Sequence, residues 1–186
     1  MKFMRLESER LTYRKYCLSD FAVVFDWLGN AENMKYRRGG AKNELQTREY
    51  LTQAITNADA EECTDFEYAV ERKSDGALIG QGTLMNLDSI PEIGWTLHRN
   101  YFRQGYGTEI GQTMLKLAFD ILGLRRVTAG CMATNRASWR LMEKIGMRRE
   151  ACFVKAQFNV YSGEWVDRLQ YAILREEWGA LCKTSL

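Results

Sequence analysis

The sequence contains 186 residues, a length that suits one folded domain able to bury a core without disulfide bonds. Its 26 basic and 24 acidic residues are interspersed, so the net charge of +2 gives no reason to expect a nucleic-acid partner. The apolar runs fall short of a membrane span, and the five cysteines and single histidine are too scattered to predict a disulfide framework or a metal centre. We therefore expect one domain over residues 1–186 in the reducing cytoplasm, without a membrane, nucleic-acid or metal partner, and either monomeric or homodimeric.

Hydrophobic periodicity divides the first half of the chain between strands and short helices. The expected elements are a strand over 10–16, a helix capped by Ser19, a helical stretch around 34–36, a helix capped by Thr47, and strands over 66–72 and 77–85. The last two strands are joined by a turn whose Asp75-Gly76 pair is typical of hairpins.

The second half centres on a strand over 92–98 and a long amphipathic helix over 107–123. Gly94 in the middle of that strand predicts either a bulge or a place where another group approaches the backbone closely. The remaining expected elements are a strand over 126–132, a helix capped by Asn135 and closed by Gly146, and a hairpin of 153–160 with 165–174. The pattern predicts an α+β fold with a mixed, largely antiparallel sheet and helices packed on it.

The loop between that strand and that helix predicts a phosphate site. It consists of Arg103, Gln104, Gly105, Tyr106, Gly107 and Thr108. A glycine-rich turn that opens a helix presents backbone N–H groups without intrahelical partners at the positive end of the helix dipole. The loop matches neither the phosphate loop of nucleotide triphosphatases, which needs Gly-Lys-Ser or Gly-Lys-Thr, nor the dinucleotide fingerprint, because Gly111 comes one residue too late.

The neighbouring segments indicate which phosphate-bearing ligand the loop is expected to bind. EIGWTLH at 92–98 precedes the loop, and NRAS at 135–138 and LMEKIGM at 141–147 follow it. In this order the segments resemble the GNAT superfamily of acetyl-CoA-dependent N-acetyltransferases. LESERLTYR at 6–14 and GEWVD at 163–167 are similar to its Rim-type branch, which acetylates the N-termini of ribosomal proteins. The likeness covers nearly the whole chain and implies a GNAT-like fold whose sheet splits at a bulged strand, with helices on both faces.

The resemblance implies where acetyl-CoA binds. Backbone N–H groups from Gln104 to Thr108 would hold the pyrophosphate, with Arg103 adding charge. The family pattern begins with Gln or Arg where this chain has Phe102, which removes a side-chain contribution there. Backbone groups around Trp95, Thr96 and Leu97 would pair with the pantetheine arm and stabilise the thioester oxyanion. Asn135 resembles the asparagine that contacts the cofactor, although helix capping alone explains it.

Two residues are candidates for catalysis. Glu92, at the end of its strand, could accept the proton of the amine directly or through water, and a solvated glutamate is the alternative. Many relatives place a tyrosine acid where this chain has Met142, so Ser138 is the expected donor to the leaving sulfur. His98 is expected at the surface.

Two regions are candidates for binding the acceptor amine. Tyr36 and Arg37 lie where the family places residues that face the substrate. The acidic residues Glu61, Glu62, Asp65 and Glu67 could attract a polyamine, or form a solvated loop. The expected activity is direct acetyl transfer to a primary amine, preferably a protein N-terminal α-amine. A small-molecule amine (polyamine, amino acid or antibiotic) and a CoA-binding module without catalysis are the alternatives.

Overall fold

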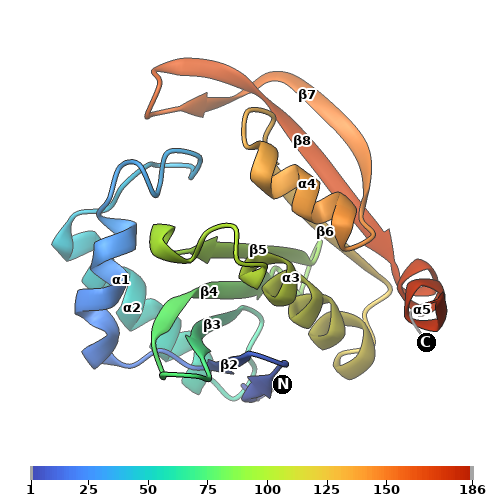
Figure 1. Ribbon diagram of the computed structural model, residues 1–186, viewed down its shortest axis with the longest axis horizontal. Helices are drawn as coiled ribbons and strands as arrows, with labels where there is room; N and C mark the ends of the chain where they lie inside the picture. Colours follow the sequence, from blue (N-terminus) through green and yellow to red (C-terminus); the bar gives the residue numbers. More distant parts are fainter. Residues whose placement is uncertain (1, 185–186) are drawn as a thin grey trace.

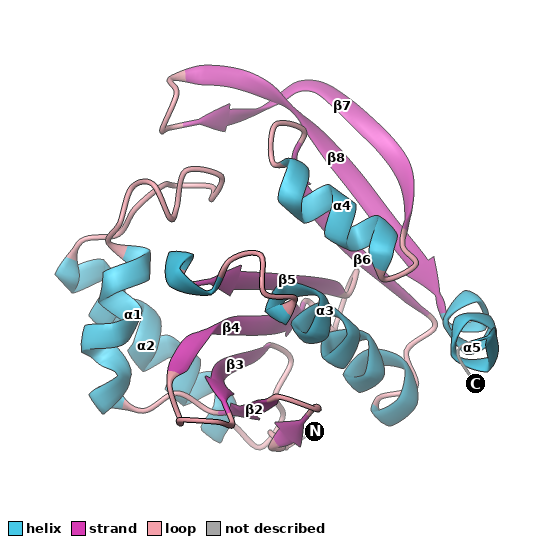
Figure 2. Ribbon diagram, in the orientation of Figure 1, coloured by secondary structure: helices cyan, strands magenta, loops and turns pink. Residues whose placement is uncertain are grey.

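The computed structural model describes residues 2–184. They form a twisted sheet of eight strands in the order β1-β2-β3-β4-β5-β6-β8-β7, with helices on both faces (Figures 1 and 2). The strands are β1 (Leu6–Glu7), β2 (Leu11–Arg14), β3 (Phe66–Arg72), β4 (Leu78–Met85), β5 (Glu92–Leu97), β6 (Arg126–Met132), β7 (Arg148–Asn159) and β8 (Glu164–Leu174). The helices are α1 (Phe21–Leu28), α2 (Glu44–Asp59), α3 (Tyr106–Lys116), α4 (Arg136–Lys144) and α5 (Arg175–Thr184).

All neighbouring strands pair antiparallel except β5 and β6, which run parallel. The parallel pair is joined through α3, because parallel strands need a crossover connection. The α+β class and the mixed, largely antiparallel sheet predicted from the sequence are confirmed, as are most of the predicted elements.

Two hydrophobic clusters lie on opposite faces of the sheet. The larger one joins α3 and α4 to β2–β6 and β8 through residues such as Tyr68, Ile110 and Met142. The smaller one joins α1 and α2 to Ala69 on β3. Successive residues of a strand point to opposite faces, so β3 and β4 each supply side chains to both clusters. The two layers are visible in Figure 1, with α1 and α2 on one side and α3 and α4 on the other.

Helix starts show where local signals suffice and where they do not. Asn135 caps α4 as predicted, because its side chain accepts a hydrogen bond from Ser138 N. The predicted cap Thr47 is wrong: α2 starts one turn earlier at Asn43, and buried Thr47 donates its hydroxyl to Asn43 O. The predicted cap Ser19 is also wrong, because it lies inside a 3-10 turn over Leu18–Asp20 that precedes α1.

Tertiary contacts override two further expectations. The residues around 34–36 form turns rather than a helix, because Asn33 bonds Leu97 O and Arg99 N on the β5 side. The bulge considered for Gly94 is not seen in the pairing with β4, whose register is continuous. The alternative of a close approach holds instead: a Cβ on Gly94 would lie 2.8 Å from Thr83 Oγ1. Neither β1 nor α5 was predicted from the sequence.

The capping box of α2 allows a stability prediction. Asn43 Oδ1 accepts from Gln46 N, and Gln46 Oε1 accepts from Asn43 N, both at 2.9 Å. Asn43→Ala is expected to lower stability by about 1 kcal/mol, a fall of about 2–4 °C in Tm for a chain of this size. Asn57→Ala, on the last turn of the same helix, is the matched control and should change Tm by less than half as much. Equal shifts for the two variants in thermal unfolding would contradict the capping role.

Candidate functional site

The loop before α3 has the conformation of an anion cradle. Arg103 and Gly105 both adopt left-handed backbone angles, with φ of 60° and 84°, and residues 103–105 are exposed. Gly105 is the N-cap of α3, and the first hydrogen bond back to the loop is from Glu109 N to Gly105 O. Within residues 2–184, no protein acceptor is found for the N–H groups of residues 103–108. A cluster of outward N–H groups at a helix N-terminus binds phosphate oxygens.

An ion pair from the first strands fixes this loop. Arg10 donates from Nη1 to Gln104 O at 3.0 Å and from Nε to Glu109 Oε2 at 2.8 Å, and its guanidinium lies over the Tyr106 ring. Glu109 also accepts hydrogen bonds from Ser8 Oγ and Arg10 N, and its pKa is lowered despite partial burial, because these three bonds favour the charged carboxylate. The sequence did not predict this anchor, since its parts are about a hundred residues apart.

Beside the cradle the sheet opens. β5 and β6 share a single paired position, Glu92 with Thr128. Thr128 also donates from N and Oγ1 to Pro91 O, at 2.8 and 2.9 Å. Beyond this point the two strands diverge, so one edge of β5 is left without a strand partner, and the split predicted for the sheet is confirmed.

Ladder alternation shows which backbone groups face the opening. His98 N donates to Ile79 O of β4, so residues at even positions of β5, including Thr96, direct their backbone groups to β4. Trp95 and Leu97 direct theirs to the open edge. Leu97 O already accepts from Asn33 Nδ2 at 3.1 Å. Trp95 is therefore the best placed of the three predicted β5 positions, whereas the Thr96 backbone is engaged in the sheet.

On the far side of the opening, α4 approaches α3 closely. A Cβ on Gly107 would lie 2.9 Å from Leu141 Cδ1, so glycine is needed for the two helices to meet here. Asn135 and Ser138 lie in the first turn of α4, and both are half-buried. Met142 is buried in the core, so the position where many relatives carry tyrosine does not face solvent.

The sequence analysis did not single out Cys131, on β6 beside Ser138. Burial raises the pKa of its thiol to about 11, against the weaker opposing effects of the Ser138 hydroxyl and the Arg168 charge. A thiol with that pKa is almost entirely protonated at neutral pH and is a poor nucleophile.

The opposite face of the sheet carries four buried polar side chains that we call the polar floor. They are Glu67 on β3, Gln81 and Thr83 on β4, and Thr96 on β5. Tyr50 of α2 donates to Gln81 Oε1 at 3.1 Å, whereas Thr96 Oγ1 is buried with no hydrogen-bond partner among the described residues. Glu92 lies at the closed end of the opening on this face, 3.8 Å from Arg168 Nη2.

The connection between α1 and α2 reaches over this face towards the tip of the β7–β8 hairpin (Figure 1). Tyr161 at the tip donates to Glu32 Oε2 at 2.7 Å, and a Cβ on Gly40 would touch Val160. Tyr36 is half-buried and Arg37 is exposed in this connection. The structure thus brings the two predicted substrate residues to the polar-floor side, away from the cradle.

The expectation that His98 lies at the surface is wrong. His98 is 5% exposed, because Trp27 and Tyr101 pack against its ring. Its Nδ1 accepts from Asn100 N at 3.2 Å and its Nε2 lies 2.7 Å from Asp26 Oδ2, which assigns the ring proton to Nε2. The hydrogen bond from His98 lowers the pKa of Asp26. With both ring nitrogens engaged, His98 ties β5 to α1 rather than facing the opening.

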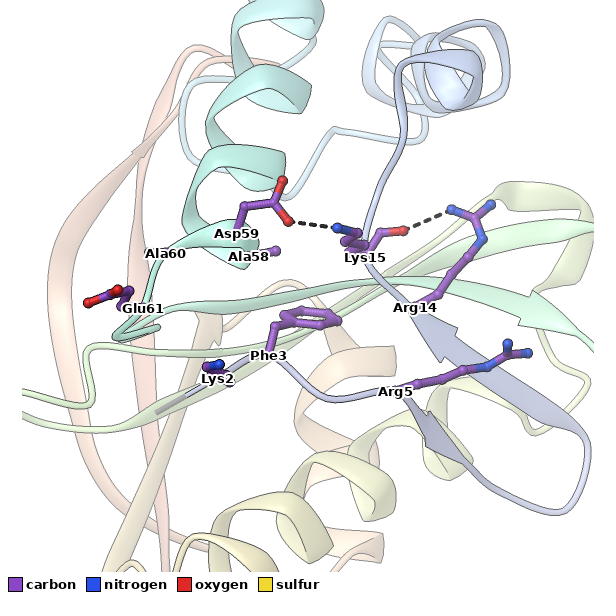
Figure 3. A pocket seen from close by; sticks show the side chains of 9 residues that line it. All are labelled: Lys2, Phe3, Arg5, Arg14, Lys15, Ala58, Asp59, Ala60 and Glu61. Carbon is purple, nitrogen blue, oxygen red and sulfur yellow. Dashed lines mark hydrogen bonds and ion pairs between the residues drawn. The ribbon is translucent and has the colours of Figure 1, made fainter.

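Two surface hollows border these elements. One, of about 730 Å³, lies between the start of α4 and β8 and is lined by residues such as Arg136, Lys155 and Trp165. The other, of about 540 Å³, lies between the N-terminal strands and the end of α2 (Figure 3). In the latter Lys15 pairs with Asp59, and Arg14 is held by Asp20 and Glu71. That hollow lies near the β1–β2 edge of the sheet, whereas the opening lies between the interior strands β5 and β6, so it is not the candidate site.

No helix in residues 2–184 is long and apolar enough to cross a membrane. In the same residues, no three or more His, Cys, Asp or Glu side chains gather as a metal site would require.

An exposed amide cradle beside an opened parallel strand pair defines the class of acyltransferases that bind an acyl-CoA. The comparisons with known proteins identify the family. Residues 10–148 match the description "Acetyltransferase (GNAT) domain". An uncharacterised N-acetyltransferase from Bacillus subtilis, YnaD, is 32% identical over 94% of this chain and 99% of its own length. A crystal structure of a GNAT-family acetyltransferase from Bacillus anthracis superposes with a TM-score of 0.82 at 32% identity, over 93% of this chain and 99% of that one.

The chain therefore belongs to the GNAT family of acetyltransferases, which use acetyl-CoA. Two more distant structures share its fold. One is the spermidine N-acetyltransferase of Vibrio cholerae in complex with CoA and spermine, with a TM-score of 0.78 and 19% identity, over 92% of this chain and 99% of that one. The other is the ribosomal-protein-S5-alanine acetyltransferase of Vibrio fischeri, with a TM-score of 0.76 and 16% identity, over 94% of this chain and 98% of that one.

Proposed function

We propose that this acetyltransferase moves an acetyl group from acetyl-CoA to a protein N-terminal α-amine, by direct attack in a ternary complex. The observation that carries the proposal is the opening between β5 and β6. On one face lies the amide cradle, whose N–H groups have no acceptor among the described residues, and on the other lies a polar, charged surface. A cofactor and an acceptor can enter from opposite faces and meet at the opening. Holding the two reactants together supplies much of the rate by proximity.

In this proposal the chain binds acetyl-CoA with backbone groups. The N–H groups of residues 104–108 hold the pyrophosphate and Arg103 adds charge. The exposed edge of β5 at Trp95 pairs with the pantetheine arm, and an N–H group on that edge polarises the thioester carbonyl. One well-placed donor of this kind is worth roughly 3–4 kcal/mol in transition-state stabilisation. Asn135 fixes the first turn of α4 beside the same arm.

The remaining roles concern protons. Glu92 or a chain of hydrogen-bonded groups takes the proton of the amine, and the amine nitrogen then attacks the carbonyl carbon. As the C–S bond breaks, Ser138 donates a hydrogen bond to the departing sulfur. The high pKa of Cys131, about 11, supports direct transfer over an acetyl-cysteine intermediate.

Charge supports an α-amine as acceptor. The polar-floor side carries carboxylates at Glu67 and Glu92 and guanidinium groups at Arg37 and Arg168. Its negative and positive charges are therefore close to balanced. A peptide N-terminus offers an ammonium with a carbonyl next to it, which suits such a mixed surface. A polyamine carries only positive charge and would be better served by an excess of carboxylates. Glu61 and Glu62 are exposed and separate from buried Glu67, which weakens the polyamine alternative.

The direct test is a panel of acceptors: alanyl, seryl and threonyl peptides, free amino acids and spermidine, each with acetyl-CoA and a thiol-release assay. We expect the highest kcat/KM on a peptide α-amine. Preference for spermidine would overturn the peptide assignment and favour the small-molecule alternative. Tight binding of acetyl-CoA without turnover of any amine would favour a CoA-binding module.

Glu92→Gln is expected to lower kcat/KM for the best acceptor at pH 7 by roughly 10-fold, because Glu92 is the carboxylate at the closed end of the opening. A rise in KM alone indicates that Glu92 binds the ammonium, and a fall in kcat indicates that it takes the proton. Glu164→Gln, on an exposed residue of β8, is the matched control. An unchanged kcat/KM for Glu92→Gln would remove Glu92 from the reaction.

A further inference from the structure

Glu67 is a buried carboxyl that the proposed mechanism does not use. It lies in the middle of the sheet on β3 and is 8% exposed. Among the described residues, no Lys, Arg or His lies within ion-pair distance of it. Burying a carboxylate without a cationic partner is unfavourable, so sequences rarely keep such a group unless it has a role.

Its surroundings favour a proton-accepting carboxyl. Burial raises the pKa of Glu67, and the charge of Asp65, just before β3, adds to this. The Tyr50 hydroxyl from α2 and the Arg37 charge from the α1–α2 connection oppose the rise. A base is most effective when its pKa lies close to the working pH. A carboxyl group with a raised pKa is therefore better matched to an amine than a carboxyl group with the ordinary pKa.

A row of facing residues connects Glu67 to the opening. Glu67 is directly opposite Thr83 on β4, and Thr83 is directly opposite Gly94 on β5. Side chains directly opposite each other in an antiparallel pair have Cβ atoms about 5 Å apart, within reach of a hydroxyl-to-carboxylate hydrogen bond. Thr83 is 7% exposed, so its hydroxyl is buried on the same face of the sheet as Glu67.

Gly94 lies where that row of residues meets the opening between β5 and β6. The Thr83 hydroxyl lies 2.8 Å from where a Cβ of Gly94 would be, so it covers the position that a side chain would otherwise occupy. Gly94 belongs to the part of β5 that has no β6 partner. The buried, unpartnered Thr96 hydroxyl lies on the same strand and face, two residues further on. Buried polar groups thus line this face of the sheet beside the opening.

We propose that Glu67 is the final acceptor of the amine's proton, and that the Thr83 hydroxyl carries the proton to it past Gly94. The inference rests on the proposed function, in which either Glu92 or a chain of groups takes the proton of the amine. It identifies the members of that chain as Thr83 and Glu67. The acceptor ammonium gives one proton to the Thr83 oxygen while Thr83 gives its own to the Glu67 carboxylate. The products are a neutral amine, an unchanged threonine and a protonated Glu67. Glu92, paired with Arg168, then has the binding role at the opening.

The pH dependence of Glu67→Gln tests this assignment. An α-amine with pKa near ~8 is roughly one-tenth neutral at pH 7, so losing the base should lower kcat/KM by about 10-fold there. Above about pH 9.5 most of the amine is already neutral, and the variant should come within about threefold of the wild type. A merely structural role would lower activity equally at both pH values.

Substitutions at Thr83 test the path. Thr83→Val keeps the shape and removes the hydroxyl, so it should reproduce the pH-dependent loss, whereas Thr83→Ser should retain most of the activity. Glu62→Gln removes the same charge from an exposed loop residue and is the control for net charge. Full activity of Thr83→Val at pH 7 would overturn the relay.

Stability separates a functional from a structural Glu67. Because its pKa is raised in the folded state, the folded protein loses stability as the pH rises from the unfolded pKa of 4.5 through the raised value. Glu67→Gln removes that loss and should raise Tm by about 2–4 °C at pH 7–8. A lower Tm would indicate a structural group.

The outcomes also separate this inference from the proposed function. If the wild type turns over no acceptor in the panel, the proposed function fails. If the wild type is active and Glu67→Gln matches it at pH 7, only the inference about Glu67 is overturned. A loss in Glu92→Gln that recovers at high pH, with normal Glu67→Gln, would assign the base to Glu92 instead.

Discussion

Gly105→Val is expected to weaken acetyl-CoA binding by roughly 30- to 100-fold. Gly105 has φ of 84°, and a β-branched residue held there costs about 1–3 kcal/mol. The new side chain would also meet Arg10, since a Cβ at this position lies 3.2 Å from Arg10 Nη2. Both effects displace the N–H groups that open α3 and put bulk where phosphate oxygens must approach. Isothermal titration with acetyl-CoA measures the loss directly.

Gly123→Val provides the matched control. Gly123 also has positive φ, 67°, and it lies past the far end of the same helix, where an added Cβ meets only Arg175 at 3.8 Å. This variant should show a similar loss of Tm with unchanged acetyl-CoA affinity. Retained binding by Gly105→Val at a normal Tm would mean that the phosphates lie elsewhere and that the cradle is only a helix start.

Ser138→Ala is expected to lower kcat by roughly 10- to 100-fold while the Kd for acetyl-CoA changes less than about twofold. The departing thiolate needs a donor, and Ser138 is half-buried in the first turn of α4, where core-buried Met142 offers none. Asn135 caps the helix through Ser138 N rather than its hydroxyl, so removing the hydroxyl leaves the cap intact. Single-turnover kinetics with saturating acetyl-CoA measure the effect on the chemical step.

Two further variants define what the Ser138 result means. Ser138→Thr retains a hydroxyl and should recover much of the loss. Cys131→Ala removes the neighbouring thiol and should leave kcat within about threefold, because a thiol with a pKa near 11 is not the nucleophile. Loss of turnover in Cys131→Ala would favour a covalent acetyl-enzyme, and an unchanged kcat in Ser138→Ala would remove that residue from the mechanism.

Local signals in the sequence were sufficient for several elements. The glycine-rich loop, the amphipathic helix after it and the Asn135 cap depend on a few adjacent residues, and each lies where the pattern predicted. The cap at Thr47 failed because Asn43, one turn earlier, makes the capping hydrogen bond to Gln46 N. The cap at Ser19 failed because a 3-10 turn over Leu18–Asp20 precedes α1, and Asp20 then occupies the N-cap position without a side-chain capping bond. Hydroxyl residues near a helix start are common, so residue type alone does not identify the cap.

The sequence by itself determined most of the strands and helices and the loop that forms the cradle, since these follow from short-range periodicity and turn chemistry, and the resemblance of its motifs pointed to the family. Tertiary structure alone decided that Arg10 anchors this loop, that His98 is buried against α1, and that Glu67, Thr83 and Gly94 form one row. The physical reason is that these relations join strands distant in the chain. Strand register sets them, and a shift of one residue in that register would send each side chain to the other face of the sheet.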